Sequence, residues 1–262
     1  MSLNENFTKQ YTLSPAAGKR LIAKSLLYIP GILEALEKKT IVIIAGTTNS
    51  YVAEEFLRKI NQEEGFIREK FFRGITLPPK YVVSETGRLG DESKFHGDVV
   101  IVNGTWEKGK TIFDVADQLK KGDVIFKGAN AVNLETMQAA ILIGHPTAGT
   151  ISPTLQCVTG RRVELYLPVG LEKRIYGDIN EISRRLNAPE ASGARYLPVS
   201  GNIVTELQAI KRICGAEAEL VASGGVCGAE GAYWIAVTGT AAQLDKMDEL
   251  FESIRHEPNF IL

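Results

Sequence analysis

The chain has 262 residues, a length that predicts one α/β body with a smaller second domain and excludes a large multidomain protein. Hydrophobic residues make up 44% of the chain, aromatic residues 8% and charged residues 23%, which suffices for a full core and excludes disordered or collagen-like sequences. The formal net charge is -1. Because no broad positive field results, we expect neither nucleic acid nor a membrane as a partner.

Three cysteines, Cys157, Cys214 and Cys227, are too few and too scattered for a disulfide framework. The sequence contains no Cys-x-x-Cys pair and no Cys/His cluster, so we expect no metal site, and nothing in it indicates a cofactor. The N-terminal residues are polar, and no stretch approaches the roughly 18 uninterrupted apolar residues of a membrane span. The sequence therefore favours a reducing, cytoplasmic location.

The first predicted elements form a helix, a strand and a second helical pattern. Ser14 is a typical N-cap residue and Pro15 suits the first helical position, so a helix is expected to begin there. After Pro30-Gly31 a shorter helix follows over 32–36. Residues 40–46 are β-branched without alternation, which is typical of a strand covered on both faces. Polar residues 47–50 then lead into a helical pattern.

Strands and helices continue to alternate downstream. Short apolar strands are predicted at 98–104, 123–128 and 163–169, and helices at 112–119 and 134–143. This alternation predicts right-handed crossovers and a mainly parallel, Rossmann-like sheet with helices on both faces. Residues 64–95 show no clear periodicity. They are interpreted as an insertion or an irregular loop region.

Small, turn-forming residues at 189–193 indicate a domain boundary. We therefore predict an α/β ligand-binding domain over 1–190 and a small α+β domain over 191–262. The second domain has a β-α-β-β-α pattern, which predicts a ferredoxin-like sheet. Its predicted elements are strands at 196–199, 218–222 and 233–237 and helices at 203–213 and 241–254.

The segment after the strand at 40–46 is the most informative candidate site. A parallel strand delivers its loop to the edge of the sheet where open α/β proteins bind ligands. Backbone N–H groups at a helix start, together with small polar side chains, suit a phosphate or carboxylate. The alternative is a plain N-cap. The residues of this predicted anion cradle are Gly46, Thr47, Thr48, Asn49 and Ser50. They match neither a P-loop nor a G-x-G-x-x-G fingerprint.

Four segments of the chain resemble one superfamily. Residues 19–36 and 40–50 are similar to the opening of the superfamily that holds type A ribose-5-phosphate isomerases, glucosamine-6-phosphate deaminases, DeoR-type sugar-phosphate sensor domains and CoA transferases. Residues 127–132 resemble its second signature, an Asp-Gly-Ala-Asp type turn, and 167–173 resemble the strand and lysine segment that closes its sheet. The resemblance covers about residues 15–175. It implies an α/β fold in which the Gly-Ser/Thr-rich loop holds a ligand phosphate.

The chain departs from this family where the isomerases carry acidic residues. Lys127 and Asn130 stand at the second turn, around Gly128, so the carboxylates that an aldose–ketose isomerase uses for proton transfer are not supplied there. Lys127 and Asn130 could instead clamp an anionic ligand against the Gly46 loop. The alternative is that Lys127 is solvated at a strand end and that Asn130 only holds a turn.

Other candidates follow neighbouring strands. Glu172 and Lys173 come just after the strand at 163–169 and could reach the same edge, although residues in this position are usually exposed. The loop at Gly104 is expected at the cleft as well. His145 could act as an acid or base near neutral pH, and the alternative is a turn or packing role. We therefore name Lys127, His145 and Glu172 as candidate catalytic residues.

A second glycine cluster, Ser223 to Gly231, contains Cys227. It could form an anion nest, but a hairpin connection between two strands is the favoured interpretation.

The sequence thus predicts that the chain binds, and in the enzyme hypothesis converts, a small phosphorylated or carboxylated metabolite of the sugar-phosphate or CoA-ester class. The site is expected at the carboxyl edge of the parallel sheet. The alternative hypothesis is a non-catalytic metabolite sensor or assembly module. Self-association into a homo-oligomer is compatible with both.

Overall fold

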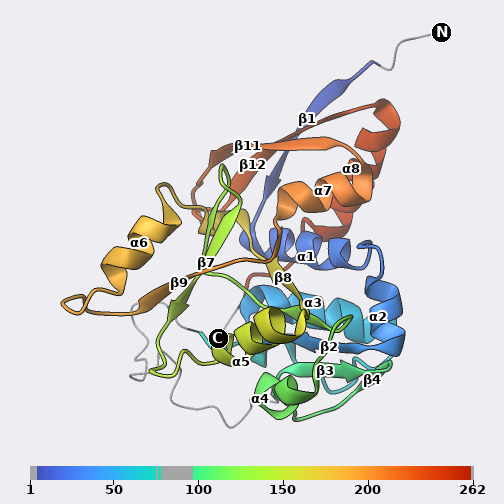
Figure 1. The fold of residues 1–262 in the computed structure, drawn as a ribbon. Helices are drawn as coiled ribbons and strands as arrows, with labels where there is room; N and C mark the ends of the chain where they lie inside the picture. Colours follow the sequence, from blue (N-terminus) through green and yellow to red (C-terminus); the bar gives the residue numbers. More distant parts are fainter. Residues whose placement is uncertain (1–4, 75, 78–96, 261–262) are drawn as a thin grey trace.

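The computed structural model describes residues 5–74, 76–77 and 97–260 (Figure 1). These residues form a mixed α/β structure with eight α-helices, one six-stranded sheet and two three-stranded antiparallel sheets. None of the helices in these ranges is long and apolar enough to cross a bilayer.

The six-stranded sheet has the order β10-β8-β5-β2-β3-β4. The first four of these strands run parallel, and β3 and β4 add an antiparallel edge. Ile41, Val42 and Ile43 in β2 are fully buried, because helices cover both faces of this strand, as its β-branched run predicts. The strands are β2 (Thr40–Ile43), β3 (Val99–Val102), β4 (Thr105–Trp106), β5 (Val124–Phe126), β8 (Glu164–Pro168) and β10 (Asn202–Val204).

Two groups of helices cover this sheet. One core cluster joins Ile41 and Ile43 to the first three helices, and a second joins Val42 and Ile125 to helices on the opposite face. The first group is α1 (Pro15–Leu26), α2 (Ile32–Lys38) and α3 (Thr47–Lys59). The second is α4 (Ile112–Val115), η2 (Ala116–Gln118), α5 (Ile151–Leu155) and the π-helical turn η3 (Gln156–Gly160). The predicted start of α1 is confirmed, since Ser14 Oγ accepts from Ala17 N at 3.1 Å and Pro15 is the first helical residue.

The two smaller sheets lie beside this body (Figure 1). One has the order β6-β7-β9 and packs against α6; its elements are β6 (Ala131–Asn133), β7 (Gln138–Ile143), β9 (Arg195–Val199) and α6 (Ile179–Leu186). The other has the order β1-β12-β11 and packs against α1, α7 and α8; its elements are β1 (Phe7–Leu13), β11 (Glu217–Ser223), β12 (Tyr233–Gly239), α7 (Glu206–Cys214) and α8 (Ala241–Ile254). Short 3-10 helices are η1 (Arg68–Lys70) and η4 (Leu171–Lys173).

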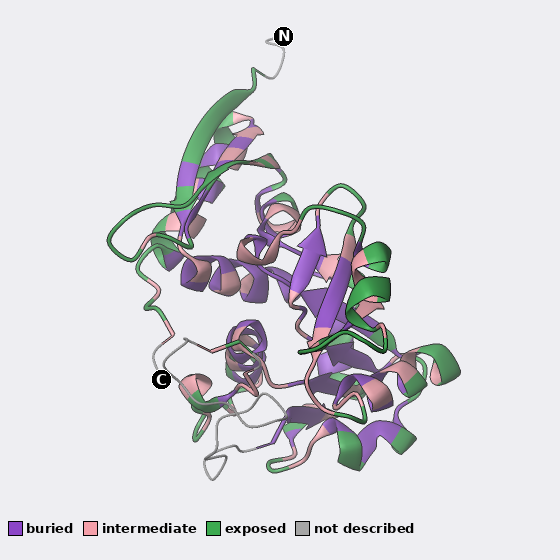
Figure 2. Cartoon of the chain, turned by 90° about the vertical axis from the view of Figure 1, so that its left-hand side faces the viewer, coloured by how far each residue is buried: buried purple, intermediate pink, exposed green. Residues whose placement is uncertain are grey.

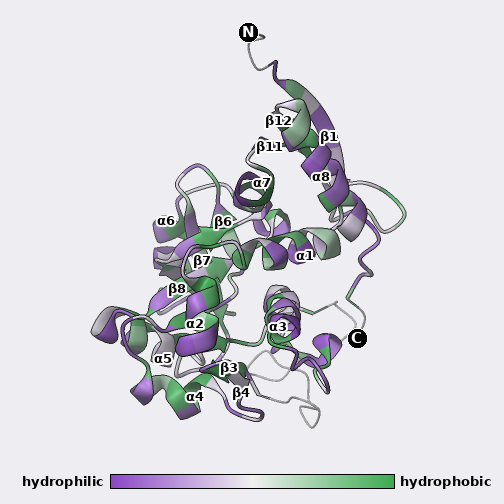
Figure 3. Cartoon of the chain, turned by 90° about the vertical axis from the view of Figure 1, so that its right-hand side faces the viewer, coloured by the Kyte–Doolittle hydropathy of each residue, from purple (hydrophilic) through white to green (hydrophobic). Residues whose placement is uncertain are grey.

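Burial and hydropathy follow this layering. Figure 2 shows buried residues running through the strands and along the helix faces that cover them. In Figure 3 the peripheral helices carry hydrophilic and hydrophobic residues together, as expected for helices with one face on a core.

Two sequence predictions about local structure are wrong. The helix predicted at 134–143 is a turn followed by β7, because an apolar run such as Ala139 to Ile141 is equally compatible with a buried strand. The helix predicted at 203–213 begins only at Glu206, after strand β10. The strand β1 was not predicted, since only Tyr11 and Leu13 on it are buried.

The predicted single sheet for 191–262 is also wrong. Strand β9 pairs with β7, β10 pairs with β8, and β12 lies between β1 and β11. Each of the three sheets therefore contains strands from both sides of residue 190. The sequence pattern located β9, β11 and β12 but not the partner that each of these strands finds. The domain boundary near residue 190 stays a prediction.

The glycine-rich segment 223–231 connects the antiparallel strands β11 and β12, which confirms the hairpin interpretation. Cys227 is exposed there and has a positive φ of 54°. In the region 64–95 the structure describes η1 and the residues up to 77 apart from 75, and residues 78–95 lie outside the described part.

Gly18 in α1 offers a test of the packing between α1, α7 and β12. A Cβ atom at Gly18 would overlap the Tyr233 hydroxyl and the Glu206 carboxylate. Gly18→Ala is therefore expected to lower the free energy of unfolding by about 2–3 kcal/mol. Helix propensity by itself predicts the opposite result, because alanine is about 1 kcal/mol more favourable than glycine inside a helix and would raise the free energy of unfolding.

The measurement is urea unfolding, with Gly160→Ala as the control because a Cβ there meets no atom within 4 Å. The control is expected to stay within about 1 kcal/mol of wild type. A Gly18→Ala protein as stable as wild type would contradict the close packing.

Candidate functional site

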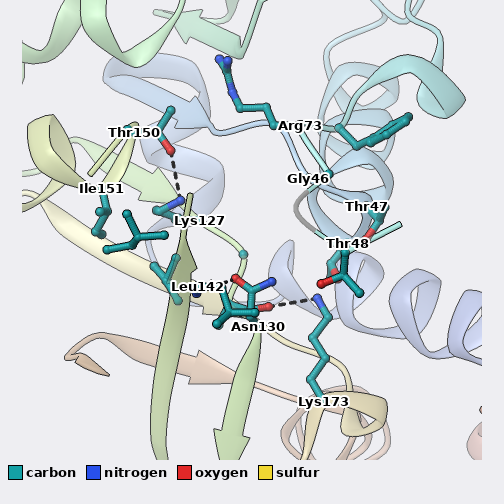
Figure 4. Close-up of a pocket in the computed structure, with 18 of the residues that line it drawn as sticks. Gly46, Thr47, Thr48, Arg73, Lys127, Asn130, Leu142, Thr150, Ile151 and Lys173 are labelled. Atoms are coloured by element: carbon teal, nitrogen blue, oxygen red, sulfur yellow. Dashed lines mark hydrogen bonds between the residues drawn. The ribbon is translucent and has the colours of Figure 1, made fainter. Parts of the chain in front are cut away.

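A cavity of about 520 Å³ opens at the carboxyl ends of β2, β5 and β8 (Figure 4). Parallel strands of open α/β sheets present their ligand-binding loops at this edge. Among the described residues, five segments line the cavity: Ala45–Thr48, Phe72–Gly74 with Thr76, Lys127–Asn130, Ile141–Ile151 without Pro146 and Thr147, and Glu172–Ile175. Two of the three loops predicted at the cleft, those at Gly46 and Lys127, therefore meet in one site.

Asp98 holds the loop between β2 and α3 in place. It is buried immediately before β3, where its Oδ1 accepts from Ala45 N at 3.0 Å and its Oδ2 from Ile112 N at 2.9 Å. Arg73 forms an ion pair with the same carboxylate at 3.2 Å. One side chain thus ties the β2–α3 loop, the start of α4 and an arginine of the cavity wall together.

The predicted anion cradle divides into two parts. Gly46, Thr47 and Thr48 line the cavity at the start of α3. Asn49 and Ser50 do not line it. The Asn49 side chain is fully buried and donates to Ile44 O at 2.7 Å and Phe126 O at 3.0 Å, and Ser50 Oγ donates to Thr47 O at 2.8 Å. These two residues join α3 to the sheet and stabilise its first turn.

Thr48 is the polar residue of the cradle best placed for a ligand. It is 2% exposed and lines the cavity. Within the described residues its Oγ1 has no hydrogen-bond partner. The first N–H groups of a helix also lack intrahelical acceptors. The start of α3 therefore presents a set of donors that an oxyanion could satisfy.

Lys127 follows β5 and is 9% exposed. Its Nζ donates to Thr150 Oγ1 at 3.1 Å, across the cavity edge (Figure 4). Burial lowers the pKa of Lys127 to about 8, and Arg73 adds to this effect while Asp98 opposes it. The side chain is therefore enclosed at the site, and the expectation of a solvated strand end is wrong.

Asn130 and Gly128 also line the cavity. Asn130 Oδ1 accepts from Leu142 N at 3.0 Å, and its backbone N–H donates to Ala140 O at 2.8 Å. Asn130 thus fixes the turn between β5 and β6 against β7, in addition to facing the cavity.

Lys173 and Glu172 enter the site from η4. Lys173 Nζ donates to Ala129 O at 3.0 Å, and burial lowers the pKa of Lys173. Glu172 forms a 3.0 Å ion pair with Lys19. Burial alone would raise the pKa of Glu172, but Lys19 and Lys173 outweigh it and the pKa lies below its usual value. Glu172 is therefore an ionised carboxylate between two lysines.

Glu206 supports η4 from behind. Its Oε2 accepts from Leu171 N at 3.0 Å and its Oε1 from Tyr233 OH at 2.6 Å. Glu206 is fully buried, and burial together with the nearby Glu172 raises its pKa to about 7. The β1-β12-β11 sheet, called the third sheet below, and α7 are thereby linked to the segment that carries Lys173.

Two other predicted residues have different outcomes. His145 lines the cavity, half-buried, and its Nδ1 lies 2.8 Å from Thr147 Oγ1.

Gly104 does not reach the site, because β3 runs antiparallel to β2 and Val102 pairs with Thr40 at the opposite end of the sheet. The direction of β3 could not be read from its apolar run.

The sequence analysis missed Arg73, Asp98 and Thr150. Arg73 lies in the stretch without periodicity, and Thr150 follows the loop predicted to come after a helix. Asp98 had a usable signal, since a carboxylate directly before a buried strand needs buried partners. The described residues contain no group of three His, Cys, Asp or Glu side chains that could hold a metal ion.

Comparison of the chain with models of protein families, with curated proteins and with solved structures gave no match.

Replacing Asp98 tests whether its carboxylate holds the site together. Asp98→Asn keeps the shape but loses one acceptor and the charge beside Arg73. It is expected to lower the free energy of unfolding by about 2–3 kcal/mol, because a buried N–H is left without an acceptor. Asp117→Asn is the control, because this carboxylate is 93% exposed and its ion pair with Arg161 is a surface pair. Equal urea midpoints for the two variants would contradict the role of Asp98.

Glu206 predicts a specific pH dependence of stability. Its folded pKa of about 7 lies above the ordinary value, so the native state binds more protons than the unfolded state between about pH 4.5 and 7. The contribution of Glu206 to the free energy of unfolding therefore falls as the pH rises through this window. Glu206→Gln stays neutral and removes this contribution.

The free energy of unfolding is measured in urea at pH 5 and pH 8. Wild type is expected to lose about 2 kcal/mol more than Glu206→Gln between these values. The exposed Glu219 provides the control, since Glu219→Gln is expected to keep the wild-type pH dependence. An unchanged pH dependence in Glu206→Gln would contradict the buried-carboxyl assignment.

Proposed function

We propose that the cavity binds a small phosphorylated or carboxylated metabolite of the sugar-phosphate or CoA-ester class. The observation that carries this proposal is a pair of ammonium groups at one cavity, those of the buried Lys127 and the half-buried Lys173. Within the described residues neither Nζ has a carboxylate oxygen at ion-pair distance, and their recorded acceptors are the neutral Thr150 Oγ1 and Ala129 O. Enclosed cations without a paired carboxylate favour an anionic ligand, which would offset the cost of their desolvation.

The start of α3 supports the same ligand class. Thr48 Oγ1 is buried and without a partner among the described residues, and it lies at a helix N-terminus where the backbone favours negative charge. The cavity volume of about 520 Å³ suits a metabolite of this size.

The resemblance of residues 15–175 to the superfamily of type A ribose-5-phosphate isomerases and CoA transferases adds to this proposal. The four parallel strands with helices on both faces are compatible with the Rossmann-like fold that the resemblance implies. A cytoplasmic location is part of the proposal and is supported by three free cysteines.

Conversion of the ligand would need a proton donor or acceptor, and the three candidates named from the sequence, Lys127, His145 and Glu172, all line the cavity. A non-catalytic sensor or assembly module is the second candidate function. It is favoured by Glu172, the one carboxylate among the described lining residues, because Lys19 and Lys173 hold its pKa below the usual value and make it a weak base.

Thermal-shift titrations test the binding proposal. Inorganic phosphate, ribose 5-phosphate and acetyl-CoA are titrated separately, and a ligand of the native state raises the melting temperature with its concentration. At least one phosphorylated compound is expected to do so. Thr48→Val, which keeps the side-chain shape, is expected to weaken its affinity about fivefold or more, because one hydrogen bond to the anion is lost.

Thr105→Val is the matched control, because Thr105 is exposed at the opposite end of the sheet. Absence of any shift, or equal affinities of wild type and Thr48→Val, would contradict the proposed site. Incubation of the binding compound with the protein, followed by NMR of the mixture, separates conversion from sensing.

A further inference from the structure

The charges at the cavity fall into two groups at two ends of the site. Each group contains a lysine whose recorded hydrogen-bond acceptor is neutral, and each is anchored to a different part of the fold. In Figure 4 Lys127, with Thr150, and Lys173 point into the site from different sides, with Asn130 between them and Thr48 toward Lys173.

The first group, the Lys127 end, consists of Lys127, Arg73, Asp98 and Thr150. The two Asp98 oxygens already accept from Ala45 N, Ile112 N and Arg73. The Lys127 ammonium has only the neutral Thr150 hydroxyl as its recorded acceptor.

The second group, the Lys173 end, consists of Lys173, Lys19, Glu172 and Thr48. Glu172 is paired with Lys19 at 3.0 Å, and the recorded acceptor of Lys173 Nζ is the neutral Ala129 O. Glu206, behind the segment, is occupied by Leu171 N and Tyr233 OH. The start of α3 and the unpartnered Thr48 Oγ1 add donors at this end.

Part of the cavity lining is apolar and is called the apolar wall below. Ile141 and Ile151 are buried and line the cavity, and Ala148 lines it beside them. An anionic group bound at one end would leave the lysine at the other end without an anionic partner among the described residues, which is unfavourable for a side chain largely shielded from water.

We propose that the ligand carries two separate anionic groups, a phosphate bound at the start of α3 beside Lys173 and a carboxylate bound at Lys127. The ligand class is thus a small phosphorylated carboxylic acid whose carbon skeleton lies along the apolar wall. This inference rests on the proposed function of the same cavity and narrows it.

Affinities for two matched sets of compounds test the inference by isothermal titration calorimetry. The three-carbon set is glycerol 3-phosphate, glycerate and 3-phosphoglycerate, and the six-carbon set is sorbitol 6-phosphate, gluconate and 6-phosphogluconate. Within each set the members carry the phosphate, the carboxylate or both. In at least one set the compound with both groups is expected to bind tenfold or more tightly than either single anion.

Two variants assign the groups to the two ends. Lys127→Met is expected to reduce the advantage of the doubly anionic compound to threefold or less and to leave the affinity for the phosphate-only compound within about twofold. Lys173→Met is expected to weaken every phosphate-bearing compound about tenfold. Lys120→Met, an exposed lysine outside the cavity, is the control. Thermal unfolding of each variant confirms that it is folded.

The outcomes separate this inference from the proposed function. If phosphate-only compounds bind as tightly as doubly anionic ones in both sets, the two-anion inference is overturned and the binding site remains. If Lys127→Met and Lys173→Met weaken the phosphate-only compound equally, one phosphate bridges both lysines and the inference is overturned as well. If no compound binds, including inorganic phosphate, both proposals fall.

Discussion

The buried carboxylate of Asp98 is the constraint on which the site depends. Because β3 runs antiparallel to β2, the start of β3 lies beside the carboxyl end of β2, where Val99 pairs with Ile43. Asp98 can therefore accept from Ala45 in the β2–α3 loop and from Ile112 at the start of α4. A parallel β3 would have placed this residue at the other edge of the sheet. The antiparallel strand is thus what supplies the loop before α3 with a fixed acceptor.

The same carboxylate sets the electrostatics of one end of the cavity. It attracts both Arg73 and Lys127, so it holds two cations near each other in a poorly solvated place. The pKa of Lys127 at about 8 shows that burial outweighs this attraction. A protein selected for stability alone would place an apolar side chain at position 127, since a buried ammonium group whose recorded acceptor is a neutral hydroxyl is unfavourable. A strained charge distribution of this kind is typical of functional sites.

The sequence predicted the parts of this site that depend on local patterns. The β-branched run of β2, the glycine after it and the polar start of α3 predicted the cradle, and Lys127 was found because it departs from an acidic signature. The partners that define the site could not be predicted, because they come from segments distant in sequence. Arg73, Thr150 and Lys19 reach it through pairings that no periodicity encodes. The error at Gly104 has the same origin, since strand direction depends on tertiary contacts.

The third sheet takes part in the site without touching the cavity. Tyr233 on β12 and Glu206 on α7 form a fully buried pair, and Glu206 accepts the N–H of Leu171, two residues before Lys173. Gly18 leaves the room in α1 that this pair occupies, so α1 contacts the pair directly. Because α1 also carries Lys19, the partner of Glu172, the position of η4 depends on the packing of α1 against the third sheet. Lys173 is therefore held by contacts from both sides of residue 190, and the cavity can be complete only when the central sheet and the third sheet are assembled together.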